Sequence, residues 1–80
     1  MASFAGIDPL EGELGKQFPY ILDKTRDYER QHPSFGIKQV VNGLYPDLKR
    51  KLADGMVHWE SDYDKQLESL IEEAYWDLLD

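Results

Sequence analysis

The two histidines, His32 and His58, are the side chains best suited to acid–base chemistry near neutral pH. A hydrolytic triad would need one of them beside a serine nucleophile, and the G-x-S-x-G turn that exposes such a serine is absent. Cysteine is absent as well, which excludes a thiolate nucleophile, a disulfide framework and a zinc site built on thiolates. We therefore predict no catalytic residues and no enzyme activity.

Two carboxylate patterns invite comparison with metal sites. Glu29 and His32 have the Glu-x-x-His spacing that places two ligands on one helix face, but bundle sites of this kind need a second copy and two further glutamates. The other pattern comprises Glu60, Asp62, Asp64 and Glu68. It lacks the central glycine of a calcium-binding loop and contains Lys65. We expect no metal and no cofactor, and a metal-dependent enzyme built on Glu29 and His32 is kept as an alternative hypothesis.

The negative charge is concentrated in the last quarter of the sequence. The 80 residues carry 16 acidic and nine basic side chains, for a net charge of −7. Residues 61–80 hold seven acids and one base, whereas residues 1–60 are nearly balanced. Direct nucleic-acid binding is not expected, because it needs clustered Lys and Arg to displace counterions from phosphate. The basic run 49–51 is expected to pair with the acidic segment, within the chain or between subunits.

Trp76 lies opposite the apolar stripe of a helix expected over residues 61–80. At roughly 100° per residue, Leu67 and Ile71 fall on one side and Trp76 falls about 180° from Leu67. The candidate partner-binding residues on the outer face are Trp76, Leu79, Glu72, Glu73, Asp77 and Asp62. Tryptophan is a preferred interface anchor, and acids speed encounter with a basic partner. The alternatives are a merely solvated charged face, and a Trp76 that folds back onto its neighbours or is covered within the bundle.

These observations favour a non-enzymatic acidic protein-binding module that docks on a basic surface of another protein through its last helix. Small acidic helical proteins include antitoxins, immunity proteins and phage-encoded inhibitors, so an inhibitor is one form of this hypothesis, by analogy of size and charge alone. A structural subunit that self-assembles through the same face, forming a homo-oligomer, is the alternative. A nucleic-acid mimic, in which carboxylates stand in for phosphates, is a further alternative.

Apolar residues recur at helical spacing along most of the chain and predict an all-α fold. We expect a small bundle of three to four helices, with a short helix near 9–17, capped by Asp8, and a second near 19–31. A third helical run is capped by Ser34 and ends before Gly55. Two of these runs are expected to be kinked or broken, at Pro19 and at Pro46. Residues 56–60 could be a buried connector, an extended piece or more helix. Ser61 and Asp64 form a capping-box-like start of the last helix.

At this length the chain has room for one hydrophobic core, so we expect a single small helical domain over residues 1–80, with 1–7 as a candidate disordered segment. No uncharged apolar stretch approaches the roughly 20 residues that a membrane helix needs. The first residues lack the basic start and apolar run of a secretory signal. We therefore expect a cytoplasmic protein that does not bind membranes.

Overall fold

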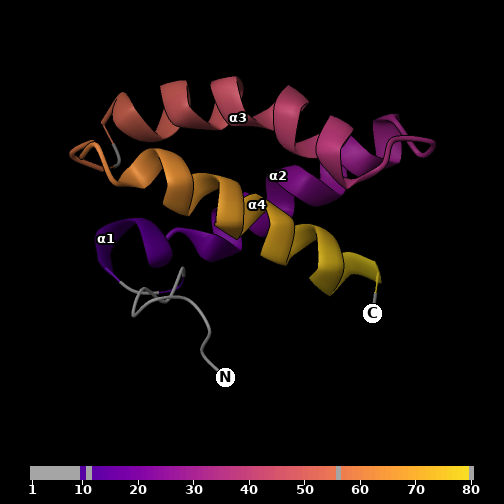
Figure 1. Cartoon of the computed structure of the whole chain (residues 1–80), viewed down its shortest axis with the longest axis horizontal. Helices are drawn as coiled ribbons and strands as arrows, with labels where there is room; N and C mark the ends of the chain where they lie inside the picture. Colours follow the sequence, from indigo (N-terminus) through magenta and orange to yellow (C-terminus); the bar gives the residue numbers. More distant parts are fainter. Residues whose placement is uncertain (1–9, 11, 56, 80) are drawn as a thin grey trace.

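The structure, a computed structural model, describes residues 10, 12–55 and 57–79. Four helices and no strands are found in these ranges: α1 (Gly12–Gly15), α2 (Phe18–Gln31), α3 (Ile37–Ala53) and α4 (Tyr63–Leu79). The predicted all-α fold is confirmed, with four helical elements (Figure 1). The candidate disordered segment 1–7 and the Asp8–Pro9 helix start lie outside the described residues.

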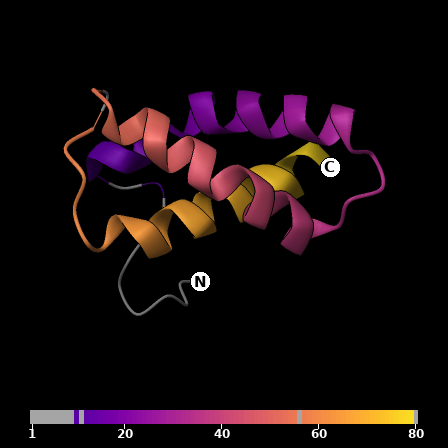
Figure 2. The ribbon, with the colours of Figure 1, turned by 90° about the horizontal axis from the view of Figure 1, so that it is seen from above.

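The last helix is the centre of the arrangement, since α4 packs against each of the other three helices. Figure 1 shows α4 in front of α2, with α3 above it and α1 below its N-terminal half. In the view from above, α3 crosses α4 at an angle and runs beside α2 (Figure 2). The buried side chains of α4 face these helices, and Glu68, Glu72, Glu73 and Trp76 are exposed.

The core is made of aliphatic side chains from all four helices. Its largest fully buried members are Leu14 of α1, Ile21 of α2, Val40, Leu48 and Leu52 of α3, and Leu67, Leu70 and Ile71 of α4. In α3 the buried side chains recur every four residues, at Val40, Leu44, Leu48 and Leu52, and form one apolar stripe. Thr25 is buried too, and its hydroxyl donates to the Ile21 carbonyl at 2.7 Å, which satisfies the polar atom inside the core.

The first helical run is divided into two helices between Gly15 and Phe18, just before Pro19. α1 ends at Gly15, and α2 begins at Phe18 with Pro19 in its first turn, where a missing N–H is harmless. Gly15 is buried because the Leu10 backbone passes directly over it, and a Cβ there would lie 2.9 Å from the Leu10 Cα. Glycine, which has no Cβ, leaves room for this approach.

The start of α3 differs from the prediction. The helix begins after Gly36, not after Ser34, and the Gln39 side-chain oxygen accepts a hydrogen bond from the Gly36 N–H at 2.9 Å. α3 is also unbroken at Pro46. Pro46 is exposed, and the buried leucines before and after it, Leu44 and Leu48, hold both halves of α3 in the core. A kink at Pro46 stays a prediction.

The connector between α3 and α4 contains the predicted glycine stop. Asp54 is the C-cap residue and Gly55 has a φ of +133°, a conformation that favours glycine. Val57 is buried, and its N–H donates to the Leu52 carbonyl at 2.8 Å. Residues 57–60 are non-helical, so the helical alternative for this stretch is wrong there, while Met56 lies outside the described residues. α4 begins at Tyr63, two residues later than predicted from Ser61.

Candidate functional site

The outer face of α4 carries the two most exposed large apolar side chains of the described residues. Trp76 is 57% exposed and Leu79 is 55% exposed. The predicted acids beside them, Glu72, Glu73 and Asp77, are exposed as well. We call these five residues the Trp76 face. Asp62 is also exposed, but it precedes the first residue of α4 and lies at the other end of the helix.

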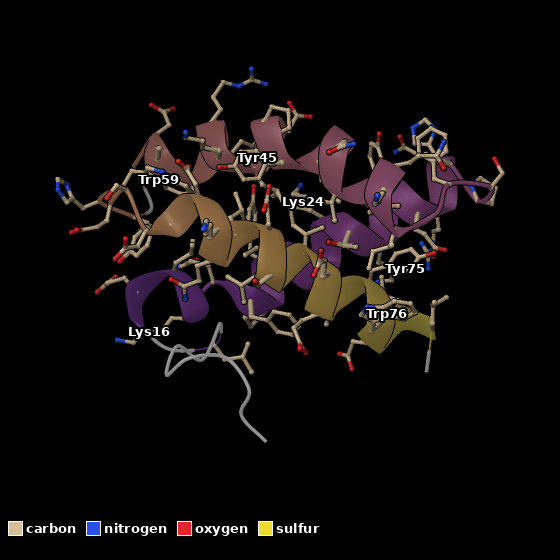
Figure 3. All side chains as sticks on the ribbon, in the orientation of Figure 1. Lys16, Lys24, Tyr45, Trp59, Tyr75 and Trp76 are labelled. Carbon is tan, nitrogen blue, oxygen red and sulfur yellow. The ribbon has the colours of Figure 1, made fainter. Side chains whose placement is uncertain are left out.

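Packing on the opposite side of α4 sets the orientation of Trp76. Leu70, Ile71 and Ala74 are fully buried against the other helices, so the angular step of an α-helix turns Trp76 outward. The neighbouring Tyr75 is buried, and its ring meets the indole edge-to-face at 5.4 Å between centroids and 78° between planes. Figure 3 shows Trp76 on the outer edge of the C-terminal turns of α4. In the structure Trp76 is therefore neither folded back into the core nor covered by another helix.

The carboxylates of the Trp76 face are uncompensated. Among the residues that the structure describes, Glu72, Glu73 and Asp77 form no ion pair and no side-chain hydrogen bond. Glu73 and Asp77 are four residues apart, as are Glu68 and Glu72, so like charges are neighbours on the helix surface. The acids of the last turns also lie at the negative end of the helix dipole. The isolated domain thus holds a concentration of negative charge that its own contacts do not stabilise.

A second polar cluster lies at the other end of α4, around Asp64. The Asp64 Oδ1 accepts hydrogen bonds from the Tyr45 hydroxyl at 2.6 Å and the Trp59 Nε1–H at 3.2 Å. The Lys49 ammonium is 3.0 Å from the same oxygen and 5.8 Å from the centre of the Trp59 ring. The Trp59 ring in turn meets Tyr63 edge-to-face at 5.5 Å. In Figure 3, Tyr45 and Trp59 lie between α3 and the start of α4, far from Trp76.

The contacts of this Asp64 cluster shift two pKa values in opposite directions. The hydrogen bonds from Tyr45 and Lys49, together with that from Trp59, hold the pKa of the Asp64 carboxyl below its usual value. Burial, followed by the hydrogen bond to Asp64 and the charge of that carboxylate, raises the pKa of the Tyr45 hydroxyl well above its ordinary value of 10.0. The Tyr45, Trp59 and Lys49 donors all have the Asp64 carboxylate as their partner. The cluster therefore links the connector and the first turn of α4 to α3.

The sequence reasoning assigned Asp64 to helix capping and missed this cluster. Two signals pointed to it: Tyr45 and Lys49 share one face of α3 at a spacing of four, and Lys49 was expected to pair with the last helix. That pairing is confirmed within the chain for Lys49. Arg50 instead pairs with Asp47 on its own helix, at 2.8 Å.

The two residues of the Glu-x-x-His pattern are not brought into a metal site. His32 ends α2, and its ring stacks on Phe35 at 4.5 Å with 10° between planes. Its backbone N–H, not its side chain, donates to the Tyr28 carbonyl at 3.0 Å. Within the described ranges, no group of three or more His, Asp or Glu side chains could hold a metal ion. His58 is exposed on the connector.

No helix within the described residues is both long and apolar enough to cross a membrane. No protein-family model, no curated protein and no solved structure matches the chain.

Proposed function

We propose that this protein is a non-enzymatic binding module that docks on a basic surface of another protein through the Trp76 face. The observation that carries the proposal is the exposure of Trp76, at 57%, in the middle of three unpaired carboxylates. More than half of this large indole is in water in the free protein, because the packing of α4 turns it outward. Contact with a partner would remove that area from water and make Trp76 an interface anchor.

The sign of the partner's charge follows from the acids. Glu73 and Asp77 repel each other in the free protein, Asp77 in the last turn also opposes the helix dipole, and cations on a partner would relieve both costs. Their exposure also lets them attract a basic surface over about a Debye length before contact, which raises the association rate. If the basic surface is the active site or binding site of the partner, this protein would act as its inhibitor.

Self-assembly through the same face is less well supported. A two-fold dimer places the same patch on both subunits, so the acids around each Trp76 would meet the acids around the other. Lys65 is the one basic residue of α4, and it lies eleven positions before Trp76. A basic partner removes this conflict, whereas a second copy increases it.

The test is affinity capture from an extract of the native host, followed by calorimetric measurement of Kd with the captured protein. Trp76→Ala should weaken binding by about 2 kcal/mol or more, the loss typical of an anchor residue. Its melting temperature should change little, because more than half of the Trp76 side chain is in water.

The matched control is Leu10→Ala, since Leu10 is the third large apolar side chain that is exposed among the described residues, at 50%, and it lies outside the Trp76 face. This variant should bind like the wild type. A partner that binds Trp76→Ala as tightly as wild type, or a Trp76→Ala variant that unfolds, would contradict the proposal.

A further inference from the structure

The position of Trp76 relative to Glu72 and Glu73 defines what kind of cation fits the face. Helical side chains lean toward the N-terminus, so the indole covers the turn that precedes its own Cα. That turn contains Glu72 and Glu73, four and three residues earlier. An exposed aromatic ring and two free carboxylates are therefore neighbours on one small area of α4.

Arginine is the side chain that can use both features together. Its planar guanidinium stacks on an aromatic face and still directs N–H groups sideways to a carboxylate in bidentate geometry. The lysine ammonium is a compact, strongly hydrated charge that satisfies the carboxylate but stacks poorly. We infer that the Trp76 face recognises arginine side chains of the partner, by stacking on Trp76 with the guanidinium paired to Glu72 or Glu73. This inference rests on the proposed function and narrows its partner class.

Leu79 and Asp77 complete the site. Leu79 is three residues after Trp76, on the same side of α4, and is 55% exposed. The three methylenes of an arginine stem can lie along such an apolar side chain while the charged group stays over the indole. Asp77 follows Trp76 directly and supplies a further unpaired carboxylate for a neighbouring cation.

The structure already contains a weaker contact of this type. Lys49 lies 5.8 Å from the centre of the Trp59 ring and pairs with Asp64. There the cation, the indole and the carboxylate all come from one chain and are satisfied. At the Trp76 face, no lysine or arginine among the described residues makes such a contact with the indole and the carboxylates, so a partner would have to supply the cation.

The test compares two synthetic peptides of equal length and charge, one with four arginines separated by alanines and one with four lysines in their place. Each is titrated calorimetrically into the full-length protein at low ionic strength. The arginine peptide should bind about two- to fivefold more tightly for one stacked guanidinium. Trp76→Ala should remove this preference, while leaving the residual charge-driven binding of both peptides.

Variants that each remove one negative charge identify the carboxylates that pair with the guanidinium. Glu72→Gln and Glu73→Gln should weaken arginine-peptide binding more than Glu68→Gln, which removes the same charge two turns before Trp76. Equal affinity for the two peptides, or an arginine preference that survives Trp76→Ala, overturns the inference but leaves the proposed function standing. Failure of both peptides to bind also overturns it, and the capture experiment decides the proposed function separately.

Discussion

One oxygen atom, Oδ1 of Asp64, joins three segments of the chain. It accepts from Tyr45 and Lys49 on α3 and from Trp59 on the connector, while its own backbone begins α4. Three donors around one carboxylate oxygen stabilise the charged form and disfavour its protonation. Because Tyr45 shares the same oxygen, ionising its hydroxyl would set two negative charges side by side.

Stability should therefore fall at both ends of the pH scale. The pKa of Asp64 is lowered on folding, so its contribution is present above its unfolded value of about 4 and is lost as pH falls below that value. The pKa of Tyr45 is raised on folding, so its contribution is present below 10.0 and is lost as pH rises further. Urea denaturation between pH 2 and 11 measures both effects.

The variants Asp64→Asn and Tyr45→Phe separate the contributions of the two groups to the pH dependence of stability. The asparagine variant should be less stable than wild type at pH 7 and should approach it as the pH falls to 2. The phenylalanine variant should lose part of the decline above pH 10. Parallel curves for wild type and Asp64→Asn across the acid range would show that Asp64 does not carry the acid sensitivity.

Residue positions that depend on helix periodicity alone were predictable. Trp76 is exposed and Leu67 is buried because both follow from the angular step along one helix. The Asp64 cluster was not predictable in this way, since it joins residues 19 positions apart in the case of Tyr45 and Asp64. Such a contact depends on how α3 crosses α4, and no local pattern encodes that crossing.

At the scale of helices, Gly43 allows α2 and α3 to approach closely. A Cβ at Gly43 would overlap the phenol of Tyr28 and lie 2.6 Å from its Cζ. The Tyr28 ring also contacts His32 at 4.6 Å and Phe35 at 6.0 Å, so the aromatic cluster at the α2–α3 turn limits its movement. Glycine inside a helix costs about 1 kcal/mol relative to alanine, and here the close packing offsets that cost.

Gly43→Ala should consequently lower stability, although alanine is the better helix former. We expect a loss of roughly 1–2 kcal/mol, in the range of overpacked sites. In a Tyr28→Ala background the same change should raise stability by about 1 kcal/mol, because only the helix preference remains. Chemical denaturation of the wild type, the two single variants and the double variant gives the coupling free energy between Gly43 and Tyr28. A stabilising Gly43→Ala in the wild-type background would mean that Tyr28 moves aside freely.

The helix ends show where local signals are strong and where they are weak. Gly55 marks the end of α3 as predicted, because a positive φ can be read from glycine in a capping position. Ser34 and Ser61 were both expected to be caps, and the helices begin after Gly36 and at Tyr63 instead. The Gln39 side chain contacts the N-cap residue of α3, and the Asp64 cluster holds the first turn of α4.

At the scale of the whole molecule, most of the net charge of −7 lies in residues 61–80, the segment that contains α4. Asp77→Lys changes the like-charged pair with Glu73 into an attractive one and places a cation at the negative end of the helix dipole. We expect stability to rise by about 0.5–1 kcal/mol, which for a domain of this size raises Tm by roughly 2–8 °C. Partner binding should weaken in the same variant, since a carboxylate of the Trp76 face is lost.

Asp47→Lys changes the net charge by the same amount at a different place. Asp47 pairs with Arg50, so this variant loses an ion pair and gains a like-charge contact. Its Tm should stay level or fall, measured by thermal denaturation in 10 mM and 500 mM NaCl beside Asp77→Lys. Equal stabilisation by both variants would show that total charge, not the local arrangement on α4, governs stability.

The central position of α4 has a consequence for synthesis on the ribosome. Translation delivers α1, α2 and α3 first, yet each of them buries apolar side chains against α4. Until residues 63–79 emerge, the nascent chain has no complete core and stays open to chaperones and proteases. The same 17 residues then present Trp76 to solvent. Chains that terminate before these residues lack the Trp76 face, so we expect them not to compete with the longer chain for the proposed partner.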